Sequence, residues 1–217
     1  HINDVRGGWS RALTRLAFVN PERTAYYDAE ATVYDESRGG PERARAAAKA
    51  ITSLVPAEGR LLDVAGGTGI VSAELARLGF DVVVTDLSRG MLRVADGRLP
   101  GRVLVGSADR LPVADGALDV VSMVWLLHLL PISVADAAIA EAARVLRPDG
   151  YLVTTVDKDL AHGRVRRTGG DAADRVAAVA RGCGLSFVGQ TSFSATTRWQ
   201  SAEGGQVFPV MALRKVG

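Results

Sequence analysis

Apolar and polar positions divide the chain into two kinds of segment. Short apolar runs with the length of buried strands lie at 60–65, 81–86, 102–105, 118–125, 151–156, 185–191 and 206–214. Between them, apolar residues recur at helical spacing, which predicts helices over 41–54, from the glycine cluster to about Leu78, from Ser88 to Arg98, over 133–146 and over 171–181. Strands that alternate with helices predict an α/β protein: a three-layer, doubly wound sheet, mostly parallel, preceded by a helical N-terminal extension.

Composition narrows the class of protein. The 217 residues are 47% hydrophobic and 23% charged, which is ordinary for a globular domain. No run approaches the ~18 apolar residues that cross a bilayer, and no signal-peptide pattern opens the chain, so we expect a cytoplasmic protein without a membrane partner. The lone Cys183 suits a reducing cytosol, and the net charge of +2 argues against a broad nucleic-acid surface. The abundance of arginine and alanine indicates a bacterial genome rich in GC.

The stretch "LLDVAGGTGI" at 61–70 places a glycine cluster directly after a predicted strand. A dinucleotide fingerprint G-x-G-x-x-G fails there, because the third position counted from Gly67 is Ser72. The ATP loop fails too, because no lysine follows the glycines. What remains is an acid followed by small residues at alternate positions: Asp63, Ala65, Gly67 and Gly69. This pattern allows a ligand to approach the backbone closely without the features that mark pyrophosphate binding.

Acidic residues also follow the next two strands. Asp86 ends the second strand, where its carboxylate is well placed to accept both hydroxyls of a ribose. Ala108 and Asp109 follow the third strand, where they could meet an adenine edge. In an open parallel sheet, ligands bind beyond the carboxyl ends of the strands. The sequence therefore predicts a nucleoside-containing ligand at that edge.

Four segments in series carry a resemblance to a known family. They are "LLDVAGGTG", "VVVTDLSRGML", "GSADRLPVADGALDVVSMVWLLHLL" and "EAARVLRPDGYLV". In this order, over roughly residues 20–156, the chain resembles the class I, seven-stranded, Rossmann-like S-adenosylmethionine-dependent methyltransferases, especially their small-molecule branch. The resemblance implies S-adenosylmethionine as cofactor, S-adenosylhomocysteine as product, no metal, and an antiparallel last strand at 206–214. It also implies a domain of 41–217 with a helical cap, 1–40, over the active site.

The resemblance assigns cofactor-binding roles residue by residue. Ala65, Gly67 and Gly69 would wrap the methionine part of the cofactor, with Asp63 beneath them. Asp86 would bind the ribose, and Ala108 and Asp109 would face the adenine. The resemblance also implies that Met91 lies near the adenine and that Tyr27 and Tyr34 close the site. Met91 also suits an ordinary core residue, and the two tyrosines also suit a packing face. These assignments agree with the chemistry, since acidic groups and backbone dipoles suit a sulfonium cation better than a phosphate cradle would.

Residues on the substrate side are less sharply indicated. His128, in "WLLHLLP" after the fourth strand, is the candidate general base, although relatives carry histidine there whether or not they use it. Tyr26 is a candidate substrate contact. The segment 157–170 carries several basic residues and is either a solvated loop or a basic lid for an anionic substrate, and in the second case its substrate-binding residues are His162, Arg166 and Arg167.

These features predict transfer of a methyl group from S-adenosylmethionine to a small molecule, in bacterial specialised metabolism such as antibiotic biosynthesis. Two alternatives stay open: a cofactor-binding pathway protein that transfers no methyl group, and a nicotinamide-dependent oxidoreductase on a related sheet. The "AGG" at 65–67 is close to the quinone-biosynthesis C-methyltransferases. However, we expect that likeness to end at the loop, because the preceding segment is long and the chain after the fifth strand is short.

Overall fold

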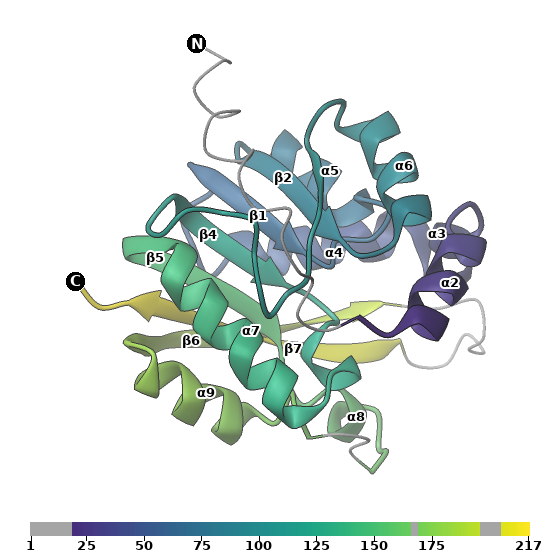
Figure 1. Ribbon diagram of the computed structural model, residues 1–217. Helices are drawn as coiled ribbons and strands as arrows, with labels where there is room; N and C mark the ends of the chain where they lie inside the picture. Colours follow the sequence, from purple (N-terminus) through teal and green to yellow (C-terminus); the bar gives the residue numbers. More distant parts are fainter. Residues whose placement is uncertain (1–18, 166–168, 196–204) are drawn as a thin grey trace.

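Seven strands form one open sheet in the computed structural model, which describes residues 19–165, 169–195 and 205–217 (Figure 1). The strands are β1 Arg60–Val64, β2 Asp81–Asp86, β3 Val103–Val105, β4 Leu118–Met123, β5 Leu146–Thr155, β6 Leu185–Ala195 and β7 Gln206–Lys215. Their order across the sheet is β3-β2-β1-β4-β5-β7-β6. The first five strands are parallel, and β7 runs antiparallel to both β5 and β6, as predicted.

Helices cover both faces of this sheet and confirm the three-layer α/β fold. The helices are α2 Pro21–Glu30, α3 Tyr34–Ser37, α4 Gly40–Thr52, α5 Ile70–Arg77, α6 Arg89–Arg98, α7 Ile132–Val145, α8 Lys158–Ala161 and α9 Ala173–Gly182, with a 3-10 turn η1 Leu127–Leu129. One face carries α7 and α9, and the opposite face carries α4, α5 and α6 (Figure 1). The short α2 and α3 lie at the end of the sheet beside α6 (Figure 1).

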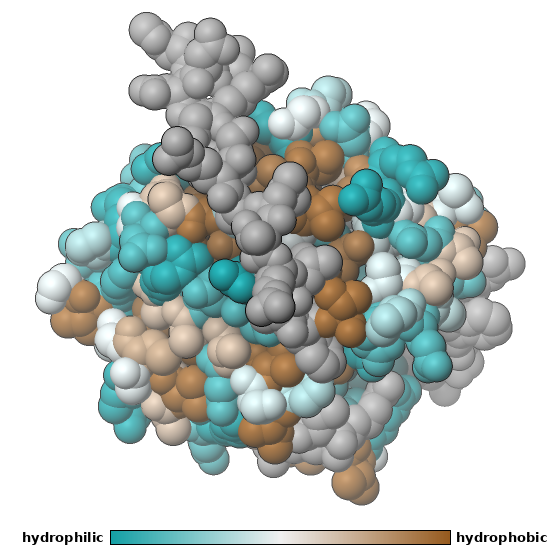
Figure 2. Space-filling view, viewed as in Figure 1, coloured by the Kyte–Doolittle hydropathy of each residue, from teal (hydrophilic) through white to brown (hydrophobic). Residues whose placement is uncertain are grey.

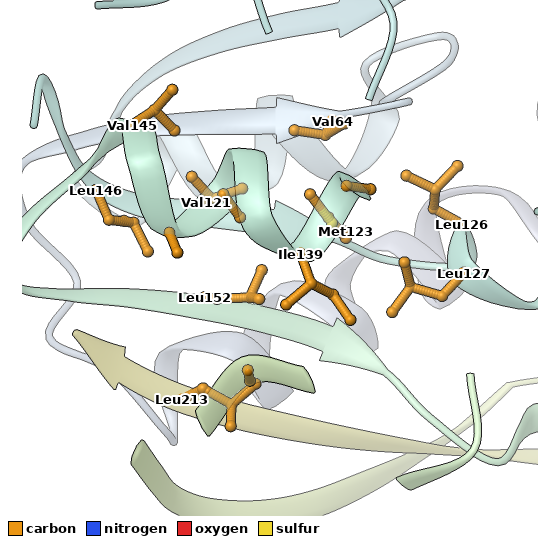
Figure 3. Close-up of a cluster of buried hydrophobic side chains, with 14 of the residues drawn as sticks. Val64, Val121, Met123, Leu126, Leu127, Ile139, Val145, Leu146, Leu152 and Leu213 are labelled. Atoms are coloured by element: carbon orange, nitrogen blue, oxygen red, sulfur yellow. The ribbon is translucent and has the colours of Figure 1, made fainter. Parts of the chain in front are cut away.

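Alternation along β1 shows why the sheet needs both helical layers. Leu62 and Val64 enter the core beneath α7 and α9, which Figure 3 shows in close-up. Leu61 points to the other face and joins the core with Ile51 of α4 and Leu75 of α5. Because all five side chains are at most 1% exposed, each contributes about 1.5–3 kcal/mol of burial free energy.

Capping side chains fix where two helices begin. Ser88 is the N-cap of α6, as predicted, and its hydroxyl accepts a hydrogen bond of 3.0 Å from the Met91 backbone N–H. Asn20 caps α2 in the same way through the Arg23 N–H at 3.0 Å. Such caps are worth about 1 kcal/mol each. The Ser88 cap matters for the site, because it sets the start of α6 directly after Asp86.

Two strand bounds differ from the predicted ones by four residues or more, and one short helix is added. β5 begins at Leu146 rather than at 151, because Leu146 already pairs with Leu118 before a bulge. β6 continues to Ala195 rather than 191, since its pairing with β7 runs to Gln206. The short helix α8 lies within the segment 157–170, where no helix was predicted. In each case long-range pairing or a single turn adds structure that local periodicity does not encode.

The surface is mixed rather than uniformly polar. Viewed as in Figure 1, hydrophobic and hydrophilic residues are interspersed over the described surface (Figure 2). Within the described ranges, no helix combines the length and apolar character that a membrane span needs. The division of the chain at residue 40 stays a prediction.

Candidate active site

The main cavity opens where the strand order reverses, at the carboxyl ends of β1, β2, β3 and β4. This is where open α/β sheets bind their ligands. Its walls combine the loop after β1 with residues after β2, β3 and β4 and with side chains from α2 and α3. It holds about 1240 Å³ of empty space counted out to its open mouth, open solvent included, and most of its lining residues are apolar or small, as is usual for small-molecule sites.

The loop after β1 is a turn that small residues make possible. Ala65, Gly67 and Gly69 have φ angles of +56°, +57° and +70°, in the left-handed region that favours glycine. A Cβ on Gly69 would lie 3.0 Å from the Cβ of Ala95, so the loop packs tightly on α6. A Cβ on Gly67 would have Met91 Sδ as its near neighbour, 3.8 Å away. Ala65, Gly67 and Met91 line the cavity, whereas Gly69 forms the turn into α5.

Asp63 braces this loop from below. Its side chain is 3% exposed and accepts hydrogen bonds from Ser72 Oγ at 2.5 Å and from Ser122 Oγ at 2.7 Å. Burial raises the pKa of Asp63, and the two hydroxyl donors oppose that rise only in part. Because both donors come from the protein, the contacts around this carboxylate support a structural role, although it also borders the cavity.

Asp86 lies at the end of β2 with its carboxylate at the cavity wall. One oxygen accepts a hydrogen bond from Gly67 N–H at 3.0 Å and the other from Ser88 N–H at 2.8 Å, and the backbone of Leu87 also donates to the carboxylate. A carboxylate offers about four lone-pair positions, so it retains acceptor capacity for a ligand hydroxyl. Burial raises the pKa of Asp86, and the backbone N–H donors counter that rise.

The segment after β3 places its two predicted residues differently. Ala108 lines the cavity next to Ser107. Asp109 is outside the described cavity wall, and its carboxylate accepts a hydrogen bond from Ser107 Oγ. The carboxylate of Asp109 therefore shapes the turn that presents Ala108, while its proposed contact with an adenine stays a prediction.

Two of the three predicted tyrosines reach the cavity. Tyr27 and Tyr34 line it, with ring centroids 6.0 Å apart in an edge-on pair. Burial raises the pKa of Tyr27, and it raises the pKa of Tyr34 to about 12, so both phenols are neutral O–H groups at pH 7. Tyr26 is 48% exposed, packs against Tyr27 and is absent from the described cavity wall.

Acidic residues that the sequence did not single out fasten α2 and α3 over the site. Asp28 of α2 accepts hydrogen bonds from Ser88 Oγ at 2.6 Å and from Gly90 N–H at 2.7 Å, at the start of α6. These donors lower the pKa of Asp28. Asp35 of α3 pairs with Arg98 at 2.6 Å. No local pattern announces these contacts, because each joins residues about sixty positions apart.

His128 is buried away from the described cavity wall. It lies in η1, is 3% exposed, and its Nε2 is 2.8 Å from the Nζ of Lys158. Since Lys158 is a donor, the imidazole accepts through Nε2 in this arrangement. The structure thus favours a positioning contact between β4 and the segment after β5, and catalysis by His128 stays a prediction.

The predicted basic lid is described only in part. Arg166 and Arg167 lie outside the described residues. His162 packs edge-on against Phe208 with centroids 5.0 Å apart, and its Nε2 is 3.0 Å from the Val207 carbonyl oxygen. Burial lowers the pKa of His162. Its substrate role stays a prediction, and its described contacts are to β7.

An aromatic wall closes the other end of the cavity. Trp125, which the pattern favours as a core residue, lines the cavity and packs edge-on against Phe193 and Phe208. The guanidinium of Arg43 lies 3.7 Å from the centroid of its ring. Sequence reasoning missed Arg43, because it comes from α4 whereas Trp125 comes from the turn after β4.

The cavity fits a cofactor that combines a nucleoside with a cation. The loop offers open space at Gly67, and Asp86 offers remaining acceptor capacity at the ribose position. Acidic groups at this end suit a sulfonium, which supplies an electrophilic methyl group when bound. Among the described residues, no group of three or more His, Cys, Asp or Glu side chains is arranged to hold a metal ion.

The sheet order, the antiparallel β7 and the cavity at the switch point define the class I, Rossmann-like methyltransferase fold. Residues 62–154 match the methyltransferase-domain family. Over these residues the chain is similar to methyltransferase domains, and its fold is shared with structures described as S-adenosylmethionine-dependent methyltransferases, which implies S-adenosylmethionine as the cofactor.

Comparison with individual proteins agrees with this class. The chain is 38% identical over 138 residues to a demethylmenaquinone methyltransferase of Renibacterium salmoninarum, covering 61% of this chain and 57% of the relative. A structure of a 4+2 cyclase, SpnF, is 20% identical with a TM-score of 0.68, covering 95% of this chain and 100% of that one. A structure described under the conversion of a disulfide bond into a thioacetal during echinomycin biosynthesis is 19% identical with a TM-score of 0.69, covering 89% and 93%.

The identity and the coverage of each comparison set what it shows. At 19–20% identity, the likeness to the two structures is one of fold. The chain spans 39% and 57% of the length of the two demethylmenaquinone methyltransferases that it matches first. One expectation is corrected: the likeness to quinone methyltransferases does not end at the glycine loop, since it extends over 138 residues.

Proposed function

We propose that this protein transfers the methyl group of S-adenosylmethionine to a small-molecule acceptor. The observation that carries the proposal is the cavity at the ends of β1 and β2, where Asp86 and the open glycine loop face each other. Methyl transfer is an in-line displacement, so the protein's main tasks are alignment and exclusion of water. Tyr27 and Tyr34 of the cap and Trp125 opposite supply walls for both tasks.

The setting that we propose is bacterial specialised metabolism. Its support is the arginine-rich composition and the fold shared with a structure studied in echinomycin biosynthesis. A second acceptor class has its own support: two relatives, at 46% and 38% identity, are named demethylmenaquinone methyltransferases. A quinol related to demethylmenaquinone therefore belongs in the acceptor panel beside phenolic and amine natural-product precursors.

Turnover is the direct test. Purified protein is incubated with S-adenosylmethionine carrying a labelled methyl group and with each acceptor, and we expect S-adenosylhomocysteine and a labelled product in equal amounts. The Asp86→Asn variant is the matched negative control. Cofactor binding without transfer to any acceptor of the panel would favour the second candidate function.

That second candidate is a protein that binds the cofactor without transferring the methyl group. It is supported by a cavity wall whose described residues include no histidine, lysine or glutamate to act as a base. The fold is also shared with a protein named as a 4+2 cyclase. A cyclised, unmethylated product formed with stoichiometric retention of S-adenosylmethionine would establish it. A nicotinamide-dependent oxidoreductase is tested by titrating both cofactors, and we expect tight binding of S-adenosylhomocysteine alone.

A further inference from the structure

Trp125 stands where β4 leaves the sheet, in a backbone conformation that most side chains avoid. Its φ is +60°, and its backbone N–H donates to Thr155 Oγ1 at 2.8 Å. Such a conformation costs about 1–3 kcal/mol and persists where the surroundings hold it. The turn sets the indole into the cavity wall, against Phe193 and Phe208 at centroid distances of 5.8 and 5.5 Å.

A guanidinium without an acid partner lies on this ring. Arg43 is 3.7 Å from the indole centroid and 4.9 Å from that of Phe208, and its Nη1 donates to the Arg38 carbonyl oxygen at 2.8 Å. No carboxylate of the described residues is within ion-pair distance, and Arg43 Nε is buried without an acceptor among them. Burial lowers the pKa of Arg43 to about 10, and the charge of Arg38 acts in the same direction.

The contacts present do not balance the charge of Arg43. Arg43 is half-buried, and its Nε is fully buried. A desolvated cation–π contact is worth about 2 kcal/mol, whereas full burial of an ion costs several kcal/mol, so the partial burial of this guanidinium is offset only in part by the ring. On the same wall, the indole Nε1 of Trp125 is buried and has no acceptor among the described residues. Buried donors without partners are rare and call for an explanation. The indole of Trp125 thus lines the ligand cavity with the Arg43 guanidinium stacked on its ring, and neither the indole N–H nor the guanidinium has an anionic partner among the described residues.

We propose that Trp125 and Arg43 form a subsite for a planar, negatively charged oxygen group of the methyl acceptor. The oxygen of the acceptor accepts a hydrogen bond from the indole N–H of Trp125, and Arg43 on the ring supplies the positive charge that balances the anion. The inference rests on the proposed function and names the substrate class: an ionised phenol or enol, or a carboxylate. It also accounts for a cavity wall without a histidine, lysine or glutamate among its described residues, because an acceptor bound as its anion needs no base.

The test uses small anions and their neutral counterparts. The full chain, saturated with S-adenosylhomocysteine, is titrated by calorimetry with 4-nitrophenolate against nitrobenzene and with benzoate against benzamide. Preference for 4-nitrophenolate identifies the phenol or enol class, and preference for benzoate the carboxylate class. We expect one of the two anions to bind at least tenfold more tightly than its neutral counterpart, since a charge-assisted hydrogen bond is typically worth about that.

Variants assign that preference to the two residues. Arg43→Met keeps the stem and removes the charge, and Trp125→Phe keeps a ring and removes the N–H. Each should reduce the anion preference about tenfold when the variant is saturated with S-adenosylhomocysteine. Arg45→Met, an exposed position on the same helix, is the control and should retain it. If Arg43→Met does not fold, Arg43→Lys and Trp125→Phe carry the test: the lysine should retain the preference and the phenylalanine lose it.

The outcomes separate the two proposals. Equal binding of anions and neutral probes by the native chain, or a preference that survives both Arg43→Met and Trp125→Phe, overturns the subsite and leaves methyl transfer standing. Failure to bind S-adenosylhomocysteine counts against the proposed function instead. In that case the anion titrations are repeated without S-adenosylhomocysteine, because the fold itself holds Trp125 and Arg43 together.

Discussion

The hydroxyl of Thr68 donates a hydrogen bond of 2.6 Å to the carboxylate of Asp35, which joins the glycine loop to the helix above it. Arg98, the last residue of α6, donates to the Thr68 carbonyl oxygen and to Asp35, at 2.6 Å each. The loop, α3 and α6 therefore share one polar network at the rim of the cavity. Through it, the position of the cap is coupled to the conformation of the loop.

Breaking this network should shorten the residence of the cofactor. Asp35→Asn removes the ion pair with Arg98, and a hydrogen bond to a charged group is worth about 1.5–3 kcal/mol. We expect the dissociation rate of S-adenosylhomocysteine to rise about tenfold in stopped-flow measurements. Glu36→Gln, an exposed neighbour on α3, is the control and should leave that rate unchanged. Equal rates for both variants would show that α3 does not retain the cofactor.

Asp86→Asn should weaken the affinity for S-adenosylmethionine at least tenfold. The amide keeps one acceptor oxygen for Gly67 or Ser88 and loses charge-assisted bonds to the ribose. Calorimetry measures the affinity, and thermal unfolding checks that the loop is intact. Asp81→Asn, at the opposite end of the same strand, removes a comparable charge and should bind like the native chain. Native affinity in folded Asp86→Asn would remove Asp86 from the cofactor site.

His128 should act through structure rather than as a base. His128→Gln keeps an acceptor for Lys158, and we expect its kcat to stay within about threefold of native, well short of the ~10²–10⁴-fold of a general base. His128→Leu removes one acceptor of the half-buried Lys158 ammonium, at a cost of about 1–3 kcal/mol, so its Tm should fall by several degrees. A hundredfold loss of kcat in His128→Gln, with a flattened acidic limb of the pH–rate profile, would instead establish the base.

Asp63 makes the unfolding free energy depend on pH in a defined direction. Its pKa in the folded chain is raised above its usual value by burial, so the native state holds a proton that the unfolded chain releases. Its contribution to stability is therefore present at acidic pH and is lost as pH rises through the folded pKa. Urea unfolding from pH 4 to pH 8 should show a smaller loss of stability in Asp63→Asn than in the native chain. Parallel curves would show that Ser72 and Ser122 fully offset the burial.

The sequence predicts those parts of the fold that local pattern determines. β2 occupies Asp81–Asp86 as the apolar run predicts, and Ser88 caps α6 as its residue type before a helical segment predicts. The start of β5 was missed, since Leu146 is a strand residue only through its pairing with Leu118. Local signals thus predicted the seven strands and the longer helices. They did not predict the boundaries that depend on pairing with a distant strand.

The site divides in the same way. Asp86 and the small residues of the loop could be found because they follow strand ends in a recognisable series. Trp125 looks like a core residue in sequence, and its place at the cavity depends on a positive φ and on Arg43 from a distant helix. No sequence pattern indicates the contact between Asp35 and Thr68, because only the folded chain brings α3 onto the loop.

The contact between Asp35 and Thr68 also makes the protein a ready optical sensor. Val33 lies two positions before Asp35 and is 50% exposed, so a fluorophore there would report the docking of α3 without entering the cavity. The chain has a single native thiol, Cys183, and a Cys183→Ser background would leave Val33→Cys as the one labelling site. Since α3 is tied to the glycine loop, the dye's emission should change with cofactor occupancy, and in an Asp35→Asn background that change should be lost.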